Sequence, residues 1–257
     1  MAIRLNTSFL AEGERALLTA IVRRLPPWTT PNHLTALGLL GAVVTAASFV
    51  FCHWSWVILP LVVFGLFLNW FGDSLDGSLA RYRGIERHRY GFFLDHSSDL
   101  IAQTFIVIGL GVSPYFTMSS ALFVLSLYLL MSSYTYLKVV THGSHSLSYG
   151  GLGATEFRIM VALWAVFAEW AGPAFIHGRI MQFAGLDVVI GALSALTFIF
   201  FIFMVRHELW RLEKEEEKAA TLYKLPSQSV ASHNKIVDDE FSQAIGEQDS
   251  EVMPASV

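Results

Sequence analysis

Apolar residues in this chain gather in long stretches, without the short alternation of polar and apolar positions that is typical of a soluble protein. A helix needs roughly 20 mostly apolar residues to cross a bilayer. Six stretches have about that length, and polar, glycine or proline residues separate them: about 34–52, 56–75, 92–112, 115–138, 156–172 and 185–206. The pattern predicts an all-α integral membrane protein with six transmembrane helices.

The two ends of the chain have different patterns. The N-terminal segment lacks the continuous apolar run of a signal peptide; instead, apolar residues recur at helical spacing between charged ones, namely Leu10, Leu17, Leu18, Ile21 and Leu25. This spacing predicts an amphipathic helix on the membrane interface. We therefore expect an amphipathic segment at 1–27, a six-helix transmembrane domain that carries the chemistry at 30–207, and a charged tail at 208–257. Beyond Leu225 the tail has no apolar period, so we expect it to be largely disordered.

Composition and charge placement support this architecture. Only 15% of the residues are charged, against about 25% in a typical soluble domain. If the N-terminus is cytoplasmic, every lysine and arginine except Arg179 falls on the cytoplasmic side of the six segments, as the positive-inside rule requires. We therefore expect both termini in the cytoplasm. No basic surface is evident, so we expect no nucleic-acid partner.

Four aspartates lie at the edges of two neighbouring apolar segments. Asp73 and Asp76 are three residues apart, and Asp95 and Asp99 are four apart, so each pair lies on one face of its helix. Because the connection between the segments is short, the four carboxylates converge near one membrane boundary. Ionisable groups in the hydrocarbon cost several kcal/mol, and a divalent cation would relieve the repulsion between them. Oxygen ligands favour Mg²⁺, Mn²⁺ or Ca²⁺, so we predict a site for one or two such ions.

Small residues and an arginine flank these aspartates. Gly77 follows the second aspartate directly; a glycine inside a helix costs about 1 kcal/mol relative to alanine, which is tolerable where a ligand approaches the backbone. Ala80 keeps the same helix face open, and Arg81 carries the planar fork that suits phosphate. Gly91, one turn before the third aspartate, leaves room for a ligand between the helices. Charges that merely anchor helix ends are usually Lys or Arg with Trp and Tyr, so that alternative is disfavoured.

These residues together resemble the signature of the CDP-alcohol phosphotransferases, also called CDP-alcohol phosphatidyltransferases. These are integral membrane enzymes of phospholipid synthesis with six core helices. The matching pattern is Asp73-x-x-Asp76-Gly77-x-x-Ala80-Arg81 followed by Gly91-x-x-x-Asp95-x-x-x-Asp99. The segment Thr30-Pro31-Asn32-x-Leu34-Thr35 is also similar to the family's entry into the first helix. One departure is the gap between Arg81 and Gly91, which holds nine residues where eight is usual.

The resemblance implies roles for individual residues. The metal ligands would be Asp73, Asp76, Asp95 and Asp99, and Asp99 would also act as the general base on the acceptor hydroxyl. The CDP site would be lined by Gly77, Ala80, Arg81, Gly91 and Asn32. Three further candidates would recognise the acceptor: His96, Glu156 and Arg158. A helix-packing role for His96 and a mutual ion pair of Glu156 with Arg158 are the open alternatives.

The resemblance also implies an activity. We expect transfer of a phosphatidyl group from CDP-diacylglycerol to a small alcohol with Mg²⁺ or Mn²⁺, releasing CMP. The compact six-helix core resembles prokaryotic members, which mostly use CDP-diacylglycerol, so we expect this donor and a bacterial plasma membrane with a cytoplasmic active site. A homodimer is a further expectation, because dimerisation is common in the family. The alternative is transfer of a phospho-aminoalcohol from a CDP-aminoalcohol to diacylglycerol, which His96 favours because it is similar to the aminoalcohol branch.

Two other classes of function are less favoured by the sequence. A cation transporter would place carboxylates near the midplane and broken helices in both halves of the chain. Here the aspartates cluster at one boundary and have no counterpart in the last three segments. A non-catalytic scaffold would leave the four aspartates without a reason.

Overall fold

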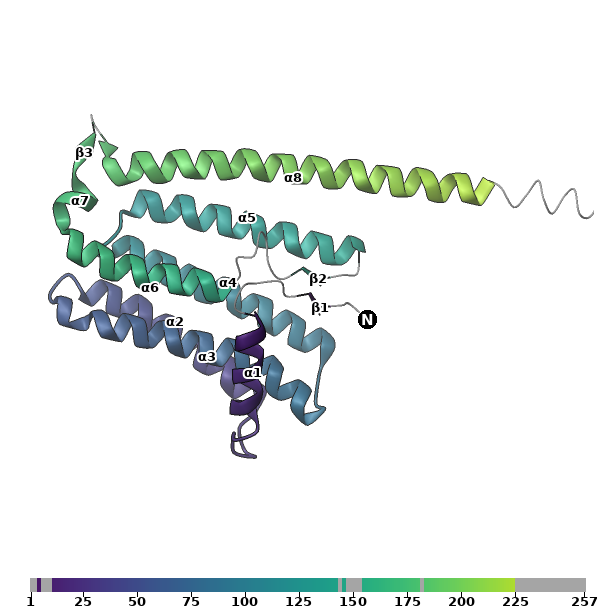
Figure 1. Cartoon of the computed structure of the whole chain (residues 1–257), viewed down its shortest axis with the longest axis horizontal. Coiled ribbons are helices and arrows are strands. Elements are labelled where there is room, and N and C mark those ends of the chain that lie inside the picture. Colours follow the sequence, from purple (N-terminus) through teal and green to yellow (C-terminus); the bar gives the residue numbers. More distant parts are fainter. Residues whose placement is uncertain (1–3, 6–10, 143–144, 147–153, 181–182, 225–257) are drawn as a thin grey trace, which may run out of the picture. The chain divides into compact units, whose positions relative to one another are not determined.

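The computed structural model describes residues 4–5, 11–142, 145–146, 154–180 and 183–224, and nearly all of them are helical (Figure 1). The long helices are α2 (Pro31–Phe51), α3 (Leu59–Arg83), α4 (His88–Val112), α5 (Met118–His142), α6 (Ala154–Ala171) and α8 (Gly185–Lys224). The short elements are α1 (Ala11–Val22), the 3-10 helix η1 (Trp56–Ile58), α7 (Pro173–His177), the parallel pair β1 (Arg4–Leu5) and β2 (His145–Ser146), and the antiparallel pair β3 (Arg179–Ile180) and β4 (Phe183–Ala184). The predicted helical class is confirmed. The tail expected to be disordered beyond Leu225 lies outside the described residues.

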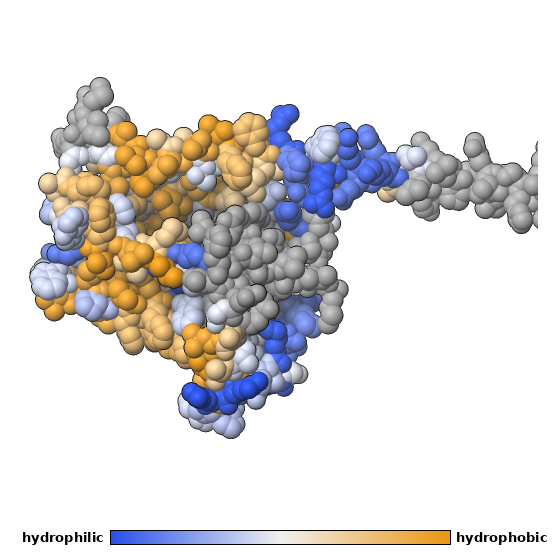
Figure 2. All heavy atoms as spheres, viewed as in Figure 1, coloured by the Kyte–Doolittle hydropathy of each residue, from blue (hydrophilic) through white to orange (hydrophobic). Residues whose placement is uncertain are grey.

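Several of these helices are suited to a bilayer. Among the described residues, four segments are long and apolar enough to cross a membrane: Pro31–Phe51, Trp56–Arg83, Met118–Thr141 and Gly185–Thr221. Many large apolar side chains on these segments are exposed, and Figure 2 shows extensive apolar surface along the helices of the first 200 residues. Of the six expected spans, α4 and α6 do not meet this criterion; they carry the charged residues described below.

Helix α3 continues further than its hydropathy predicts. The apolar pattern ends near residue 75, yet hydrogen-bonded helix continues to Arg83, because backbone bonding does not need apolar side chains. Gly84 then ends the helix in the left-handed conformation (φ 64°), with its N–H directed to the carbonyls of Ala80 and Arg81. Asp73 and Asp76 therefore lie inside α3, about two to three turns before its end. The predicted short connection to α4 is present, since α4 begins at His88.

Helices α2 and α3 pack with their backbones in contact. A Cβ on Gly41 would lie 2.7 Å from the carbonyl oxygen of Gly65, and a Cβ on Gly65 would lie 2.8 Å from the backbone nitrogen of Thr45. Real side chains do not tolerate such distances, so only glycine fits at this crossing, as in other close-packed membrane helices. The close approach brings the first turns of α2 beside the aspartates of α3.

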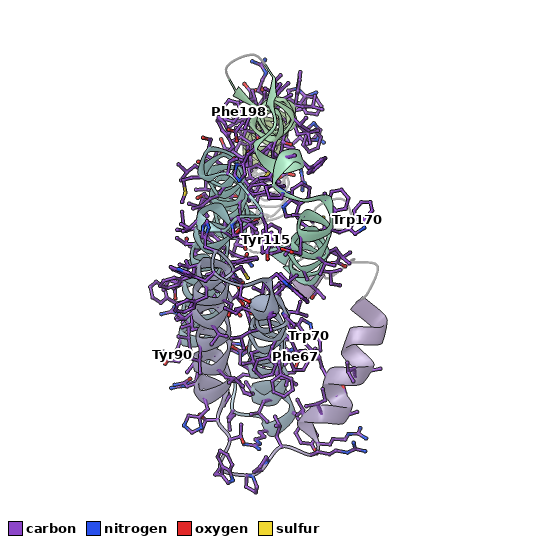
Figure 3. The ribbon with its side chains drawn as sticks, turned by 90° about the vertical axis from the view of Figure 1, so that its left-hand side faces the viewer. Phe67, Trp70, Tyr90, Tyr115, Trp170 and Phe198 are labelled. Atoms are coloured by element: carbon purple, nitrogen blue, oxygen red, sulfur yellow. The ribbon has the colours of Figure 1, made fainter. Side chains whose placement is uncertain are left out.

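Helix α1 packs on the C-terminal half of α3. The two helices and the start of α2 share one apolar cluster, formed by Leu18, Val22, Leu34, Leu75 and Leu79. Trp70 of α3 packs against this cluster (Figure 3). Arg83 donates to the carbonyl oxygens of Pro26 (2.8 Å) and Thr29 and so holds the segment between α1 and α2. The membrane-interface position of this helix stays a prediction.

The chain divides into two compact units, Met1–Phe200 and Phe201–Val257. The candidate site lies wholly in the first unit. In the second unit, α8 continues to Lys224 through the charged start of the tail, with Arg211 donating to Glu215 one turn later (2.9 Å).

Candidate functional site

The four predicted aspartates meet in one pocket between α2, α3 and α4. Its lining consists of Thr35, Gly38, Leu39, Asn69, Asp73, Asp76, Asp95, Ser98, Asp99 and Ala102. Each helix contributes one face to this pocket, because its lining residues recur every three to four positions along the helix. The convergence predicted from the short connection between the two aspartate-bearing helices is therefore present.

Three of the carboxylates are close enough to share one cation. One oxygen each of Asp73, Asp95 and Asp99 lies within 4.8 Å of the other two. Two oxygens bound to the same Mg²⁺ lie up to about 4.2 Å apart, and Ca²⁺ allows slightly more. The donor set is made only of carboxylate oxygens from partly buried side chains, so it fits a hard divalent cation better than zinc.

Asp76 has a different environment from the other three aspartates. It is only 8% exposed. Its Oδ2 accepts a hydrogen bond from the hydroxyl of Thr35 on α2 (2.6 Å), and its Oδ1 accepts from the N–H of Gly77 (2.5 Å). Both oxygens are therefore oriented by neighbouring groups, and Asp76 adjoins the three-carboxylate cluster rather than belonging to it.

Arg158 of α6 lies against the aspartates and is buried (4% exposed). Its Nη2 donates to Oδ2 of Asp73 (2.8 Å), and its Nε donates to Oδ1 of Asn69 (2.7 Å). Asn69 in turn donates from Nδ2 to the carbonyl oxygen of Gly38 (2.9 Å). The sequence suggested acceptor recognition or a pairing with Glu156 for this arginine; these contacts place it on the metal-ligand candidate Asp73. Glu156 lies in the first turn of α6, partly buried.

Sequence reasoning missed Asn69 and Thr35 as parts of the site. Asn69 precedes Asp73 by one helical turn on the same face, so its spacing in the sequence could have identified it as a residue of the site. Thr35 belongs to the segment that resembles the family's first helix, but nothing in that segment indicates its partner, because Asp76 is 41 residues away.

The predicted nucleotide-site residues of α3 continue from the pocket toward the helix end. Gly77 and Ala80 are partly buried, whereas Arg81 is exposed. The Nη2 of Arg81 donates to the hydroxyl of Ser78 (3.2 Å). None of these three residues lines the pocket itself. They form the stretch of α3 between the pocket and the connection to α4.

Asn32 and Gly91 lie at the same end of the molecule. Asn32 donates to the hydroxyl of Tyr90 (3.2 Å) and accepts from Arg87 (3.2 Å), so it joins the start of α2 to the start of α4; Tyr90 is labelled in Figure 3. A Cβ on Gly91 would meet nothing within 4 Å. This first turn of α4 is therefore not tightly packed among the described residues, in keeping with space for a ligand.

His96 lies between α4 and α5. Its ring stacks on Tyr136 (centroids 5.0 Å apart) and meets Phe92 edge-on (4.3 Å). Its Nδ1 is 3.6 Å from Oδ2 of Asp95. These contacts fit the helix-packing alternative, and they also keep the imidazole beside the carboxylate cluster.

Comparisons with known proteins agree with the motif. The family model described as CDP-alcohol phosphatidyltransferase matches residues 28–200. Cholinephosphotransferase 1 of Gallus gallus is 28% identical over 169 residues, which is 60% of this chain and 48% of the relative. The Danio rerio protein of that name is 24% identical over 206 residues (72% and 51%), and the Homo sapiens protein is 25% identical over 163 residues (60% and 39%). The chain thus matches about half or less of the length of these curated relatives.

Proposed function

This chain belongs to the CDP-alcohol phosphatidyltransferase family, and from that premise we propose that it transfers a phospho-aminoalcohol from a CDP-aminoalcohol to diacylglycerol, releasing CMP. The observation that carries the proposal is the pocket in which Asp73, Asp76, Asp95 and Asp99 come together. The family resemblance noted in the sequence is confirmed by the match over residues 28–200.

The direction of transfer is supported by the relatives. All those described above are named cholinephosphotransferases, and His96 after Asp95 is similar to the aminoalcohol branch. These two observations favour the aminoalcohol direction over transfer from CDP-diacylglycerol, which the compact core alone suggested. A CDP-choline donor and a diacylglycerol acceptor are therefore the first substrates to test.

The aspartates are the proposed ligands of a divalent cation. Asp73, Asp95 and Asp99 would hold one ion, and Asp76 would contribute to a second ion or to the same one. When bound, Mg²⁺ or Mn²⁺ would neutralise negative charge on the diphosphate. Arg81, exposed at the hydrophilic end of α3, would bind the nucleotide phosphates through its planar fork.

The reaction needs one proton transfer and one displacement at phosphorus. Asp99 would take the proton from the acceptor hydroxyl, whose oxygen forms a bond to the phosphorus that carries the aminoalcohol. The bond from that phosphorus to the oxygen shared with the second phosphate breaks, and CMP leaves with the electron pair. A positioned general base typically contributes 10²–10⁴-fold.

The membrane arrangement follows the same proposal. We assign six spans, adding α4 and α6 to the four segments that meet the length and hydropathy criterion. The chain would then have three parts: the amphipathic segment 1–27, the catalytic domain 30–207 and the tail 208–257. The distribution of Lys and Arg supports cytoplasmic termini and a cytoplasmic opening of the pocket, through which a water-soluble CDP-aminoalcohol would enter. A bacterial plasma membrane and a homodimer remain expectations from the family resemblance.

One assay tests the proposal. Purified protein in nanodiscs is incubated with Mg²⁺ or Mn²⁺ and either CDP-choline with diacylglycerol, or CDP-diacylglycerol with a panel of small alcohols. We expect CMP and a choline phospholipid in the first mixture. CMP only in the second mixture would reverse the direction of transfer, and no CMP in either would contradict the enzymatic function.

A further inference from the structure

We propose that Arg158 is a positioning residue of the metal centre, and that its guanidinium fixes the Asp73 carboxylate in the orientation that binds the cation. This inference rests on the proposed function, because it takes Asp73 to be a metal ligand. In this role Arg158 orients a metal ligand and does not contact the acceptor.

The guanidinium is held at two points on α3. Nη2 donates to Asp73 (2.8 Å) and Nε donates to Asn69 (2.7 Å), which lies one helical turn earlier. The amide of Asn69 is itself fixed by its bond to the carbonyl oxygen of Gly38 on α2 (2.9 Å). The orientation of Asp73 therefore depends on three helices, α2, α3 and α6.

Such an anchor matters because Asp73 lies in a cluster of like charges. Its carboxylate has two others within 4.8 Å, and electrostatic repulsion would favour its rotation away from them. Arg158 engages Oδ2 and leaves the other oxygen of Asp73 for a cation. Groups that hydrogen-bond to a ligating carboxylate commonly fix its orientation, and removing them typically costs 10–100-fold in metal affinity or activity.

Two other roles for Arg158 make different predictions. If only its charge mattered, a lysine would serve equally well. If it bound a substrate phosphate through Nη1, which has no hydrogen-bond partner among the described residues, it would affect substrate binding and not metal binding. A lysine keeps the charge but offers one nitrogen, so it cannot reproduce the two-point contact.

The test measures Mn²⁺ binding without substrates. Wild-type protein, Arg158→Lys and the control Arg211→Lys are purified in detergent and titrated with Mn²⁺ while free Mn²⁺ is followed by electron paramagnetic resonance. Arg211 is an exposed arginine that also pairs with a carboxylate (Glu215, 2.9 Å). We expect a 10–100-fold weaker affinity in Arg158→Lys and no change in Arg211→Lys. Wild-type affinity in a folded Arg158→Lys would overturn the inference.

A second variant keeps the test decisive if Arg158→Lys does not fold. Asn69→Ala removes the other anchor of the guanidinium, so it should weaken Mn²⁺ binding in the same direction by a smaller factor; unchanged affinity would count against the inference. If Arg158→Lys raises KM for CDP-choline and leaves Mn²⁺ affinity intact, Arg158 binds substrate instead. If the wild-type protein itself binds no Mn²⁺, the proposed metal centre fails together with this inference. If the wild-type protein binds Mn²⁺ and the variants bind it with the same affinity, only this inference fails.

Discussion

The hydroxyl of Thr35 on α2 donates a hydrogen bond to the carboxylate of Asp76 on α3 at 2.6 Å. Both side chains are buried, at 6% and 8% exposure. The bond joins the first turns of α2 to the aspartate pair of α3. It orients Oδ2 of this carboxylate, whose Oδ1 accepts from the N–H of Gly77.

Replacing this hydroxyl tests its contribution directly. Thr35→Val keeps the shape of the side chain and removes the donor. Because hydrogen bonds to charged groups contribute about 1.5–3 kcal/mol, we expect CMP formation to fall about 10-fold or more. The control is Thr104→Val on α4, whose exposed hydroxyl donates to the carbonyl oxygen of Leu100 one turn earlier in the same helix (2.7 Å). Equal activity of the two variants would rule out this role for Thr35.

Asp99 is the proposed general base, and its amide variant should be nearly inactive. Asp99→Asn removes the proton acceptor and a ligand oxygen while it preserves side-chain volume. We expect CMP release to fall by 10²–10⁴-fold. The control is Asp187→Asn, which changes a partly buried aspartate outside the pocket, in the first turn of α8, whose carboxylate accepts from the hydroxyl of Ser120 (2.7 Å). Full activity of Asp99→Asn would remove it from the reaction even if the enzyme assignment held.

Cation binding should stabilise the protein by relieving repulsion between the carboxylates of Asp73, Asp95 and Asp99. At a Mn²⁺ concentration 100 times Kd, linkage predicts about 2.7 kcal/mol of added stability, measured as a rise in Tm in detergent. Asp95→Asn should raise the Tm in EDTA, because one of three like charges is gone, and should shrink the rise caused by Mn²⁺. A Mn²⁺ shift of wild-type size in this variant would argue that the ion binds elsewhere.

Arg83 should control how firmly α1 is held. Its guanidinium donates to backbone carbonyls of Pro26 (2.8 Å) and Pro27 (3.2 Å), among others. We expect Arg83→Met to expose this segment, so that trypsin cuts faster after Arg23 and Arg24. The rate of this cleavage, followed by mass spectrometry of the N-terminal fragment, is compared with that in Arg211→Met. An unchanged rate would mean that the apolar contacts with α3 hold α1 without Arg83.

Gln103 is a buried polar residue outside the proposed mechanism. It is fully buried, one turn beyond Asp99, and neither of its side-chain amide atoms has a hydrogen-bond partner among the described residues. An unsatisfied buried polar group costs about 1–3 kcal/mol, so Gln103→Leu should raise the Tm by several degrees with unchanged CMP formation. A loss of activity without loss of folded protein would instead give Gln103 a part in substrate binding.

Local pattern was enough to find the helices and the aspartates. The apolar segment at 34–52 corresponds closely to α2 (Pro31–Phe51), because the length and apolarity of a spanning helix are properties of the segment itself. The apolar segment at about 56–75 is shorter than α3, which continues to Arg83, because hydropathy marks where apolar side chains stop and not where backbone bonding stops.

The sequence by itself determined which carboxylates share a helix face, since the spacing of Asp73 from Asp76 and of Asp95 from Asp99 is fixed by the helical repeat. Only the tertiary structure decided what surrounds them. Arg158 reaches Asp73 across 85 residues of sequence, and Thr35 reaches Asp76 because Gly41 and Gly65 let α2 and α3 approach closely. Such pairs depend on how each helix is rotated and packed against its neighbours, and local spacing carries no information about that rotation.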